Sequence, residues 1–413
     1  MCKEKQSIYL TGIGMGAEKS MTEEAREIFR SCDCIIGADR MTSALQSLGK
    51  PIFSSYKPEE IHKFLVEHTE YKKVAVALSG DPGFYSGAKK LEEELSDYSV
   101  RIIPGISSAV YLAAKLGISW EDARFVSIHG RQQNFIYEIS AHEKTFLLFG
   151  GKDSGTEICE KVHHYGLEGV DFYIGKHLSY ENEEILHKKG GKLLAEDFEG
   201  LAAAYILNSC AHTRLCPYIE DEEFIRGNVP MTKSEIRTIS IGKLGLNEKS
   251  VLYDIGAGTG SVSIEAALQS GSIKVYAVEK NPEGIELIRQ NCHKFCCDHV
   301  EVIAGRAPEV LLSLEPPTHV FIGGSSGNLK EILQAVRDKN PEVKIVLNAI
   351  SLETVKEVME SIEEGLLIEP EITQISVAKS RKLGAYHMMT GQNPVYIVAD
   401  NHTTMPLSSK EPH

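Results

Sequence analysis

Val251-Leu-Tyr-Asp-Ile-Gly-Ala-Gly-Thr-Gly260 is the stretch that decides the fold of the second half of this 413-residue chain. An apolar run ends at Asp254, and the glycines of Gly256-x-Gly258-x-Gly260 follow it. This order is typical of a strand entering a tight turn at the edge of a parallel sheet, where a backbone without Cβ atoms approaches a ligand closely. The next apolar run, residues 274–278, ends at Glu279.

The glycine spacing and the two acidic strand ends favour S-adenosylmethionine over a dinucleotide as the ligand. Gly-x-Gly-x-Gly lacks the extra residue of Gly-x-Gly-x-x-Gly, in which a helix N-terminus receives a pyrophosphate. S-adenosylmethionine is cationic and carries no phosphate, and Glu279 is placed to accept hydrogen bonds from its ribose. We predict a donor site formed by Thr232, Asp254, Gly256, Ala257, Gly258, Thr259, Gly260, Glu279, Gly305 and Ala307.

Composition limits the class of protein. With 42% hydrophobic residues and no run long enough to span a bilayer, the chain is expected to form two ordinary domains of a cytoplasmic protein. A net charge of −14 argues against nucleic acid or an anionic membrane as partner. Nine cysteines without a secretory signal fit a reducing compartment. We expect free thiols rather than metal ligands, and no metal site, at Cys32, Cys34, Cys292, Cys296 and Cys297.

The first half alternates short β-rich runs with helical stretches, as α/β domains do. Thr22–Ser31 is a predicted helix with Thr22 at its N-cap. The predicted strands are Ser7–Gly12, Cys34–Gly37, Val74–Ser79, Val100–Ile103, Phe125–His129, Thr145–Phe149, Asp171–Gly175 and Ala202–Leu207.

The second half restarts at residue 231, where Thr232 and Glu235 form a capping-box pattern. Its seven predicted strands match an open, doubly wound sheet. They are an apolar strand that runs into Asp254, a strand from Lys274 that ends on Glu279, and Val300–Ala304, His319–Ile322, Lys344–Asn348, Ile372–Ala378 and Val395–Ala399. We predict domains at 1–207 and 229–413, joined by a linker at 208–228.

Six segments of the second half resemble the class I methyltransferase domain of cobalamin biosynthesis, the CbiT type, which implies a Rossmann-like fold. They are Met231-Thr-Lys, Asp254-Ile-Gly-Ala-Gly-Thr-Gly-Ser-Val-Ser-Ile-Glu-Ala, Val278-Glu-Lys-Asn-Pro-Glu-Gly, Gly305-Arg-Ala-Pro-Glu, Phe321-Ile-Gly-Gly-Ser-Ser-Gly and Asn348-Ala-Ile-Ser-Leu-Glu-Thr.

The first half resembles the tetrapyrrole methylases of the CbiE type, which implies two α/β lobes. The segments that carry this resemblance are Gly12-Ile-Gly-Met-Gly, Ile36-Gly-Ala-Asp-Arg40, Ser79-Gly-Asp-Pro-Gly-Phe-Tyr, Ile103-Pro-Gly-Ile-Ser-Ser and His129-Gly-Arg131. The chain departs from the family pattern at Met15, where proline is common, and at His177-Leu-Ser-Tyr-Glu181, where a Glu-Asn-Leu-Gly type segment is usual.

The fusion of the two halves resembles the precorrin-6Y C(5,15)-methyltransferase (decarboxylating) family. The resemblance implies methylation of carbon 5 by the first half, and methylation of carbon 15 with loss of the ring C acetate carboxyl by the second. It also implies a tetrapyrrole substrate, with or without cobalt, and self-association into a homo-oligomer. It implies a second S-adenosylmethionine site, in the first half, at Gly80, Asp81, Pro104, Gly105, Ser107 and Ser108.

Basic and polar residues near the two predicted sites are candidates for the acidic arms of such a substrate. These are Arg40, Arg131, Lys233, Arg237, Gly323, Gly324, Asn348 and Arg381. Tyr386 and His387 are predicted to deliver a proton during decarboxylation, and Glu265 is a further catalytic candidate. The alternatives are a methyltransferase for another tetrapyrrole position, a nucleotide-dependent dehydrogenase, and a non-catalytic tetrapyrrole carrier.

Overall fold

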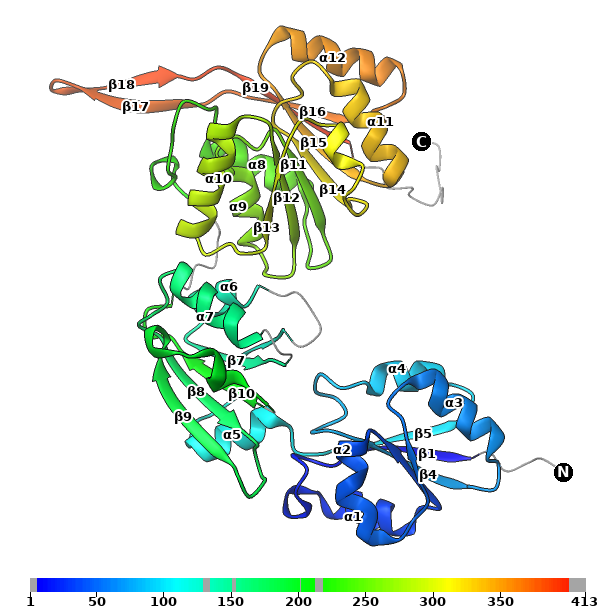
Figure 1. Ribbon diagram of the computed structural model, residues 1–413. Coiled ribbons are helices and arrows are strands. Elements are labelled where there is room, and N and C mark those ends of the chain that lie inside the picture. Colours follow the sequence, from blue (N-terminus) through cyan, green and yellow to red (C-terminus); the bar gives the residue numbers. More distant parts are fainter. Residues whose placement is uncertain (1–5, 129–133, 151–153, 201, 212–217, 401–413) are drawn as a thin grey trace, which may run out of the picture. The chain divides into compact units, whose positions relative to one another are not determined.

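The chain divides into two compact units. A computed structural model describes residues 6–128, 134–150, 154–200, 202–211 and 218–400 (Figure 1). The first unit comprises residues 1–132 and 142–211, and the second comprises residues 133–141 and 212–413. Both units combine sheets with helices, which confirms the predicted α/β class. Within the described ranges, no helix is long and apolar enough to cross a membrane.

The first unit begins with a parallel five-stranded sheet in the order β3-β2-β4-β1-β5. Its strands are β1 (Ser7–Gly12), β2 (Cys34–Gly37), β3 (Ile52–Ser54), β4 (Lys73–Leu78) and β5 (Ser99–Ile103). The helices around it are α1 (Glu23–Ser31), α2 (Asp39–Thr42), α3 (Pro58–Glu67) and α4 (Ala88–Glu94), whereas α5 (Ser108–Leu116), which follows β5, packs against the second sheet of this unit. Thr22 caps α1 by accepting a hydrogen bond from the Ala25 N–H, as predicted.

A second five-stranded sheet completes the first unit, in the order β6-β7-β10-β8-β9. Only β6 and β7 pair in parallel, and the other pairs are antiparallel. The strands are β6 (Arg124–Ser127), β7 (Lys144–Leu148), β8 (Asp171–Lys176), β9 (Glu184–Lys189) and β10 (Ala202–Leu207), with helix α7 (Ser154–His164). The two sheets correspond to the two predicted α/β lobes.

The second unit contains the predicted seven-stranded sheet, in the order β13-β12-β11-β14-β15-β19-β16. Strands β11 to β15 are parallel, whereas β19 is antiparallel to both of its neighbours. The strands are β11 (Val251–Ile255), β12 (Lys274–Glu279), β13 (Val300–Ala304), β14 (His319–Ile322), β15 (Lys344–Ala349), β16 (Glu371–Ile375) and β19 (Val395–Asp400). The order reverses between β11 and β14, which places a crevice at the carboxyl ends of these strands.

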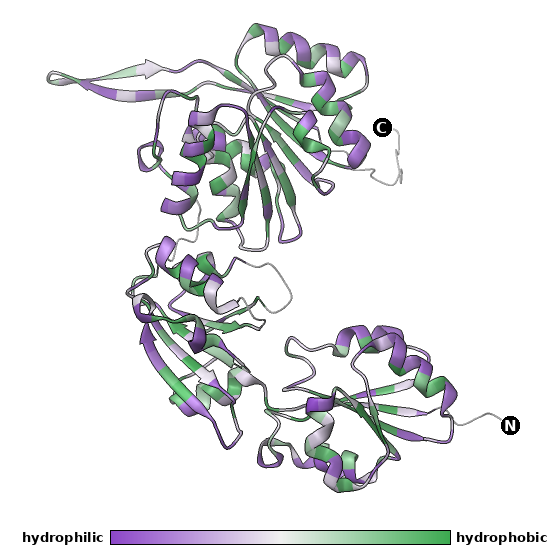
Figure 2. Ribbon diagram, in the orientation of Figure 1, coloured by the Kyte–Doolittle hydropathy of each residue, from purple (hydrophilic) through white to green (hydrophobic). Residues whose placement is uncertain are grey.

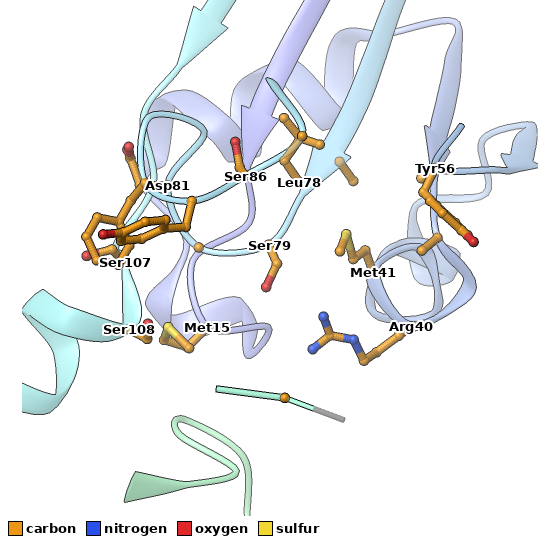
Figure 3. Close-up of a pocket in the computed structure, with 18 of the residues that line it drawn as sticks. Met15, Arg40, Met41, Tyr56, Leu78, Ser79, Asp81, Ser86, Ser107 and Ser108 are labelled. Carbon is orange, nitrogen blue, oxygen red and sulfur yellow. The ribbon is translucent and has the colours of Figure 1, made fainter. Parts of the chain in front are cut away.

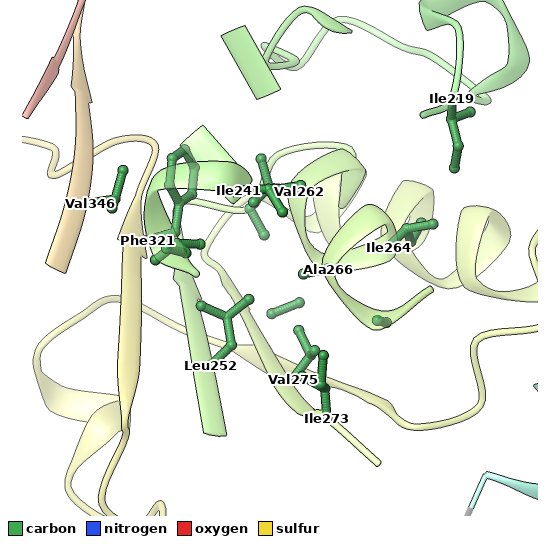
Figure 4. Close-up of a cluster of buried hydrophobic side chains, with 14 of the residues drawn as sticks. Ile219, Ile241, Leu252, Val262, Ile264, Ala266, Ile273, Val275, Phe321 and Val346 are labelled. Atoms are coloured by element: carbon green, nitrogen blue, oxygen red, sulfur yellow. The ribbon is translucent and has the colours of Figure 1, made fainter. Parts of the chain in front are cut away.

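Helices cover both faces of this sheet. One face packs against α8 (Ser234–Leu244), α9 (Ser261–Ala267) and α10 (Pro282–Lys294), and the other against α11 (Leu329–Lys339) and α12 (Leu352–Glu363). Figure 4 shows apolar side chains of α8, α9 and the sheet converging in the first of these cores. The helices alternate hydrophilic and hydrophobic bands, whereas the strands are mostly hydrophobic (Figure 2). This pattern is expected for amphipathic helices that cover a buried parallel sheet.

Two further segments pack in the second unit. Helix α6 (Phe135–Ala141) belongs to it, and the Tyr137 hydroxyl donates a hydrogen bond to the Leu268 carbonyl. Part of the predicted linker also packs here, because Ile219 and Phe224 are buried in the core beside α8. The domain limits at 207 and 229 stay a prediction, and residues 218–228 contribute to the packing of the second unit.

A two-stranded hairpin, β17 (Ala378–Leu383) and β18 (Tyr386–Gly391), extends from the second unit (Figure 1). All of its residues are exposed on both faces. The hairpin was not predicted. The predicted strand Ile372–Ala378 instead ends at Ile375 as β16, and Ala378 begins β17.

Candidate active sites

The second unit has a cavity of about 260 Å³ at the carboxyl ends of its central strands. Its walls include seven predicted residues, namely Gly256, Gly258, Glu279, Gly305, Ala307, Gly323 and Gly324. Gly256 and Gly258 have φ angles of +75° and +60°, and a Cβ atom on Gly258 would lie 2.4 Å from the Pro230 carbonyl oxygen. These positions require glycine, so the turn presents bare backbone to the cavity.

Glu279 organises the edge of this cavity. Its Oε1 accepts hydrogen bonds from the N–H groups of Lys280 (2.9 Å) and Asn281 (2.8 Å), and its Oε2 accepts one from the Gly258 N–H (2.8 Å). A carboxylate has about four acceptor positions, so about one remains for a ligand hydroxyl. The arrangement suits the ribose of a nucleoside and ties the glycine turn to β12.

Asp254, predicted to contact the donor, does not line the cavity. It is 1% exposed, and its Oδ2 accepts hydrogen bonds from the N–H and the hydroxyl of Ser263, near the start of α9. Its Oδ1 is buried without a hydrogen-bond partner among the described residues. Burial raises the pKa of Asp254 to about 7, against the opposing effect of the Ser263 hydrogen bonds. Asp254 therefore supports the turn from behind.

Replacing Asp254 with asparagine is expected to change how stability depends on pH. Because the pKa of Asp254 is higher in the folded than in the unfolded chain, the wild type loses stability as pH rises through about 7. Between about pH 6 and pH 8 the free energy of unfolding of the wild type should fall by about 1 kcal/mol more than that of Asp254→Asn. Hydrogen exchange in β11 and β12, recorded at each pH for the wild type and the variant, measures this difference in the free energy of unfolding. Parallel pH profiles would contradict the protonation of Asp254.

Arg237 and Glu265, predicted to bind substrate and to act in catalysis, form a buried ion pair away from both cavities. Arg237 Nε lies 2.8 Å from Glu265 Oε1, and the two side chains are 0% and 3% exposed. Arg237 also donates to Asp221 Oδ1 (3.3 Å) and stacks on Phe224, with 4.9 Å from its guanidinium carbon to the ring centre. Glu265 Oε1 accepts the Ile219 N–H (2.9 Å). Their burial argues for a structural role.

Asp221 also explains why the predicted capping box is wrong. Helix α8 has Lys233 as its N-cap residue, with no hydrogen bond from a capping side chain. The Ser234 N–H donates instead to Asp221 Oδ1 (3.0 Å). The Nζ atom of Lys233, a predicted substrate contact, lies 3.6 Å from Asp221 Oδ2. A carboxylate distant in sequence thus replaces the local cap.

Other predicted residues of the second unit lie behind the cavity wall. Asn348 is 9% exposed and accepts a hydrogen bond from the Ser240 hydroxyl (3.1 Å), and its Nδ2 has no partner among the described residues. Gly260 begins α9. Five predicted residues therefore do not line the cavity, namely Asn348, Gly260, Thr232, Ala257 and Thr259.

Sequence reasoning missed two cations on the cavity wall, Lys280 and Arg306. Lys280 Nζ donates to the Ser326 hydroxyl (2.8 Å), and Arg306 donates to the Ser326 carbonyl (3.3 Å) and to Asn328 Oδ1 (2.8 Å). Neither cation forms an ion pair within the described ranges, in contrast to Lys233 and Arg237. Their positions, directly after Glu279 and Gly305, could have indicated them.

The predicted proton donors lie on the exposed hairpin. Tyr386 is 76% exposed, and His387 pairs with Lys382 across the hairpin. Arg381, a predicted substrate contact, is on the same hairpin and also exposed. None of the three lines the cavity described above or the cavity of the first unit described below, so the geometry of these two cavities does not support their predicted roles.

The first unit has a larger cavity, of about 680 Å³, between its two sheets (Figure 3). Five predicted site residues line it, namely Arg40, Gly80, Asp81, Ser107 and Ser108. The guanidinium of Arg40 points into the open space near Met15 and Ser79 (Figure 3), and it forms no ion pair among the described residues. An unpaired guanidinium on such a wall suits a carboxylate ligand.

Asp81 joins two loops of this cavity. Its Oδ1 accepts the Gly83 N–H (2.8 Å), and its Oδ2 accepts the Gly105 N–H (3.0 Å). Ser107 caps α5 by accepting the Val110 N–H (3.3 Å), so the first turn of α5 faces the cavity. Pro104 and Gly105 lie behind the wall, and Arg131 is outside the described residues.

The cysteines that were predicted to be free thiols are largely buried. Burial raises the pKa of Cys34 to about 11 and that of Cys292 to about 12, so both are neutral thiols at neutral pH. Among the described residues, no group of three or more His, Cys, Asp or Glu side chains is arranged to hold a metal ion.

Comparison with known proteins assigns the family. A model of the precorrin methyltransferase domain matches residues 223–400, and a model of the tetrapyrrole (corrin/porphyrin) methylases matches residues 7–194. The probable cobalt-precorrin-6B C(15)-methyltransferase (decarboxylating) of Pyrobaculum calidifontis is 42% identical over 185 residues, which are 44% of this chain and 94% of the relative. The cobalt-precorrin-6B C(15)-methyltransferase (decarboxylating) of Salmonella typhimurium is 36% identical over 190 residues, which are 45% of this chain and 98% of the relative.

A crystal structure of a precorrin-6Y C5,15-methyltransferase from Geobacter metallireducens is also similar, with 40% identity and a TM-score of 0.42. The similarity covers 44% of this chain and 95% of that one. The enzymes of Pyrobaculum calidifontis and Salmonella typhimurium match this chain over nearly their whole length. Because of this identity, the chain belongs to the precorrin methyltransferases, with a tetrapyrrole methylase half preceding the precorrin methyltransferase half.

Proposed function

We propose that the chain is a bifunctional S-adenosylmethionine-dependent methyltransferase of corrin ring synthesis. The first half methylates carbon 5 of precorrin-6Y/6B or the cobalt equivalents, and the second methylates carbon 15 and removes the ring C acetate carboxyl. The observation that carries the proposal is the presence of one glycine-lined cavity in each half, each half matching a different methyltransferase family.

The residues of each cavity fit a methyl donor. In the second cavity, glycines at which a Cβ atom would clash with neighbouring backbone lie beside a carboxylate with spare acceptor capacity. When bound, S-adenosylmethionine supplies an electrophilic methyl group, so the protein needs chiefly to align it with a nucleophilic ring carbon. Alignment in a closed cleft contributes roughly 7–11 kcal/mol at best.

Local cations support binding of a polyacid by a chain of net charge −14. Arg40 in the first cavity, and Lys280 and Arg306 in the second, have no carboxylate partner among the described residues. Ammonium and guanidinium groups in such places bind acetate and propionate arms. For decarboxylation, the conjugated macrocycle accepts the electron pair, and the protein must desolvate the departing carboxylate.

Product mass tests this function. The wild-type chain, incubated with S-adenosylmethionine and precorrin-6Y/6B, with or without cobalt, should yield a product with two added methyl groups and one carbon dioxide lost. The same incubation with NAD in place of the donor should leave the macrocycle unchanged. Hydride transfer from the macrocycle to NAD, or no reaction with either form of the macrocycle, would refute the proposal.

We also propose that the chain forms a homo-oligomer through the β17–β18 hairpin. An isolated two-stranded hairpin is marginal in water, and this one exposes Leu383, Tyr386, Met388 and Met389 by 56–76%. Exposed apolar side chains on strands with free edges favour pairing with another chain. A second copy of the hairpin offers both the strand edges and the apolar surface.

Deleting residues 378–391 is expected to convert the oligomer to a monomer in light-scattering measurements. The ends are close, because the Gln392 N–H donates to the Val377 carbonyl at 2.8 Å, so a two-glycine turn can rejoin them. Binding of S-adenosylhomocysteine should persist, since the hairpin lines neither cavity. A matched variant with Leu383 and Met389 changed to serine should weaken the oligomer. An unchanged mass after deletion would contradict the proposal.

A further inference from the structure

A strained turn forms part of the wall of the first cavity. His177 and Ser179 have φ angles of +48° and +73°, which non-glycine residues rarely adopt, and the intervening Leu178 and the following Tyr180 line the cavity. Left-handed conformations at two positions of one turn persist only where the surroundings hold them. We call residues 177–180 the 177–180 turn.

Glu183 holds this turn in place. Its carboxylate accepts hydrogen bonds from the Ser179 N–H (2.7 Å), the Tyr111 hydroxyl (2.8 Å) and Lys115 Nζ (2.6 Å). Burial by itself would raise the pKa of Glu183, but these three donors lower it to about 2. Glu183 is therefore ionised at neutral pH and fixes the backbone at Ser179.

The turn meets the glycine loop at the other side of the cavity. The Ala17 N–H donates to the Ser179 hydroxyl (3.2 Å). Gly16 has a φ angle of +106°, and a Cβ atom there would lie 2.1 Å from the Tyr180 hydroxyl oxygen. The two segments that depart from the family pattern, Met15 and 177–181, thus lie together at one cavity.

The Tyr180 hydroxyl has no hydrogen-bond partner among the described residues, although it lies on the cavity wall. Half-buried hydroxyls normally find partners, so this one is available to a ligand. Arg40 lines the same cavity, also without a carboxylate partner among the described residues. A hydroxyl and a guanidinium that line one cavity suit a carboxylate.

We propose that Tyr180 is a specificity-determining residue of the first cavity, whose hydroxyl donates a hydrogen bond to a ligand carboxylate, and that Glu183 is its positioning residue. This rests on the proposed function of that cavity. The carboxylate has two possible sources, an acid arm of the macrocycle or the amino-acid end of the methyl donor.

Tyr180→Phe tests the proposal because it removes only the hydroxyl. If the carboxylate belongs to the macrocycle, the KM for carbon 5 methylation should rise roughly ten-fold while the affinity for S-adenosylhomocysteine stays unchanged. If it belongs to the donor, calorimetry should show roughly ten-fold weaker binding of S-adenosylhomocysteine at this cavity. Binding of methylthioadenosine, which lacks the carboxylate, should then be unaffected. Changes below about two-fold in both parameters would overturn the proposal.

Glu183→Gln tests the positioning role. It should affect the same parameter as Tyr180→Phe, and the double variant should be no worse than the more impaired single variant, because both changes disable one contact. A role in stability alone would lower the melting temperature and leave the two effects additive. Glu181→Gln, a change at an exposed neighbour, is the matched control.

These outcomes separate the inference from the proposed function. If the wild type binds S-adenosylhomocysteine in the first cavity but transfers no methyl group to carbon 5, the proposed function fails. The affinities for S-adenosylhomocysteine and for the macrocycle, both measured without turnover, then test Tyr180, and unchanged affinity for both in Tyr180→Phe overturns the inference.

Discussion

Glu279→Ala is expected to weaken the binding of S-adenosylhomocysteine to the second cavity by roughly 100-fold. The variant loses a hydrogen bond between a ligand hydroxyl and a charged carboxylate, which contributes about 1.5–3 kcal/mol. It also frees the Gly258 N–H, which Glu279 Oε2 holds at 2.8 Å, so the glycine turn loses its tie to β12. Both losses act on the same wall of the cavity.

Isothermal titration of the full chain measures this effect, because the first cavity provides an internal reference. The wild type should show two binding events, and Glu279→Ala should lose only the one that belongs to the second cavity. Glu283→Ala is a matched control, since Glu283 also accepts a backbone N–H, from Asn228 at 2.7 Å, but does not line the cavity. Equal loss in both variants, or two intact events in Glu279→Ala, would contradict the assigned role.

The sequence was a good guide to strands that are rich in apolar residues. Strands β1, β2, β10, β13 and β14 have the predicted limits. Four strands escaped detection. Strand β3 has only three residues, while β9 and the β17–β18 hairpin consist largely of polar or exposed residues. Such strands are defined by backbone pairing with a neighbour, which leaves little hydrophobic pattern in the sequence.

The candidate sites show the same limit. Glu279 and the glycines were found because a strand end and a tight turn leave local marks in the sequence. Lys280 and Arg306 were missed because their importance depends on which cations remain unpaired. That depends on contacts between distant segments, such as residues 219–224 folding back onto α8.

Arg237 was assigned to the substrate for this reason, and its replacement provides the sharpest test of the revised role. Arg237→Ala would leave Asp221 and Glu265, which are 5% and 2% exposed, as buried carboxylates without their cation. Burial already raises the pKa of Glu265, and Arg237 opposes that shift. Removing one partner of a buried ion pair costs about 3–5 kcal/mol, because the remaining charge stays desolvated.

The free energy of unfolding of the second unit should therefore fall by about 3–5 kcal/mol in Arg237→Ala, measured by hydrogen exchange in β11 and α8 of the full chain. Lys233→Ala should cost less than about 1 kcal/mol, since the Lys233 side chain is 37% exposed and lies 3.6 Å from Asp221. The double variant Arg237→Met, Glu265→Gln should recover part of the loss, because replacing both partners leaves fewer unpaired charges. If Arg237→Ala instead kept its stability and raised the KM for the macrocycle, the guanidinium would belong to the substrate site after all.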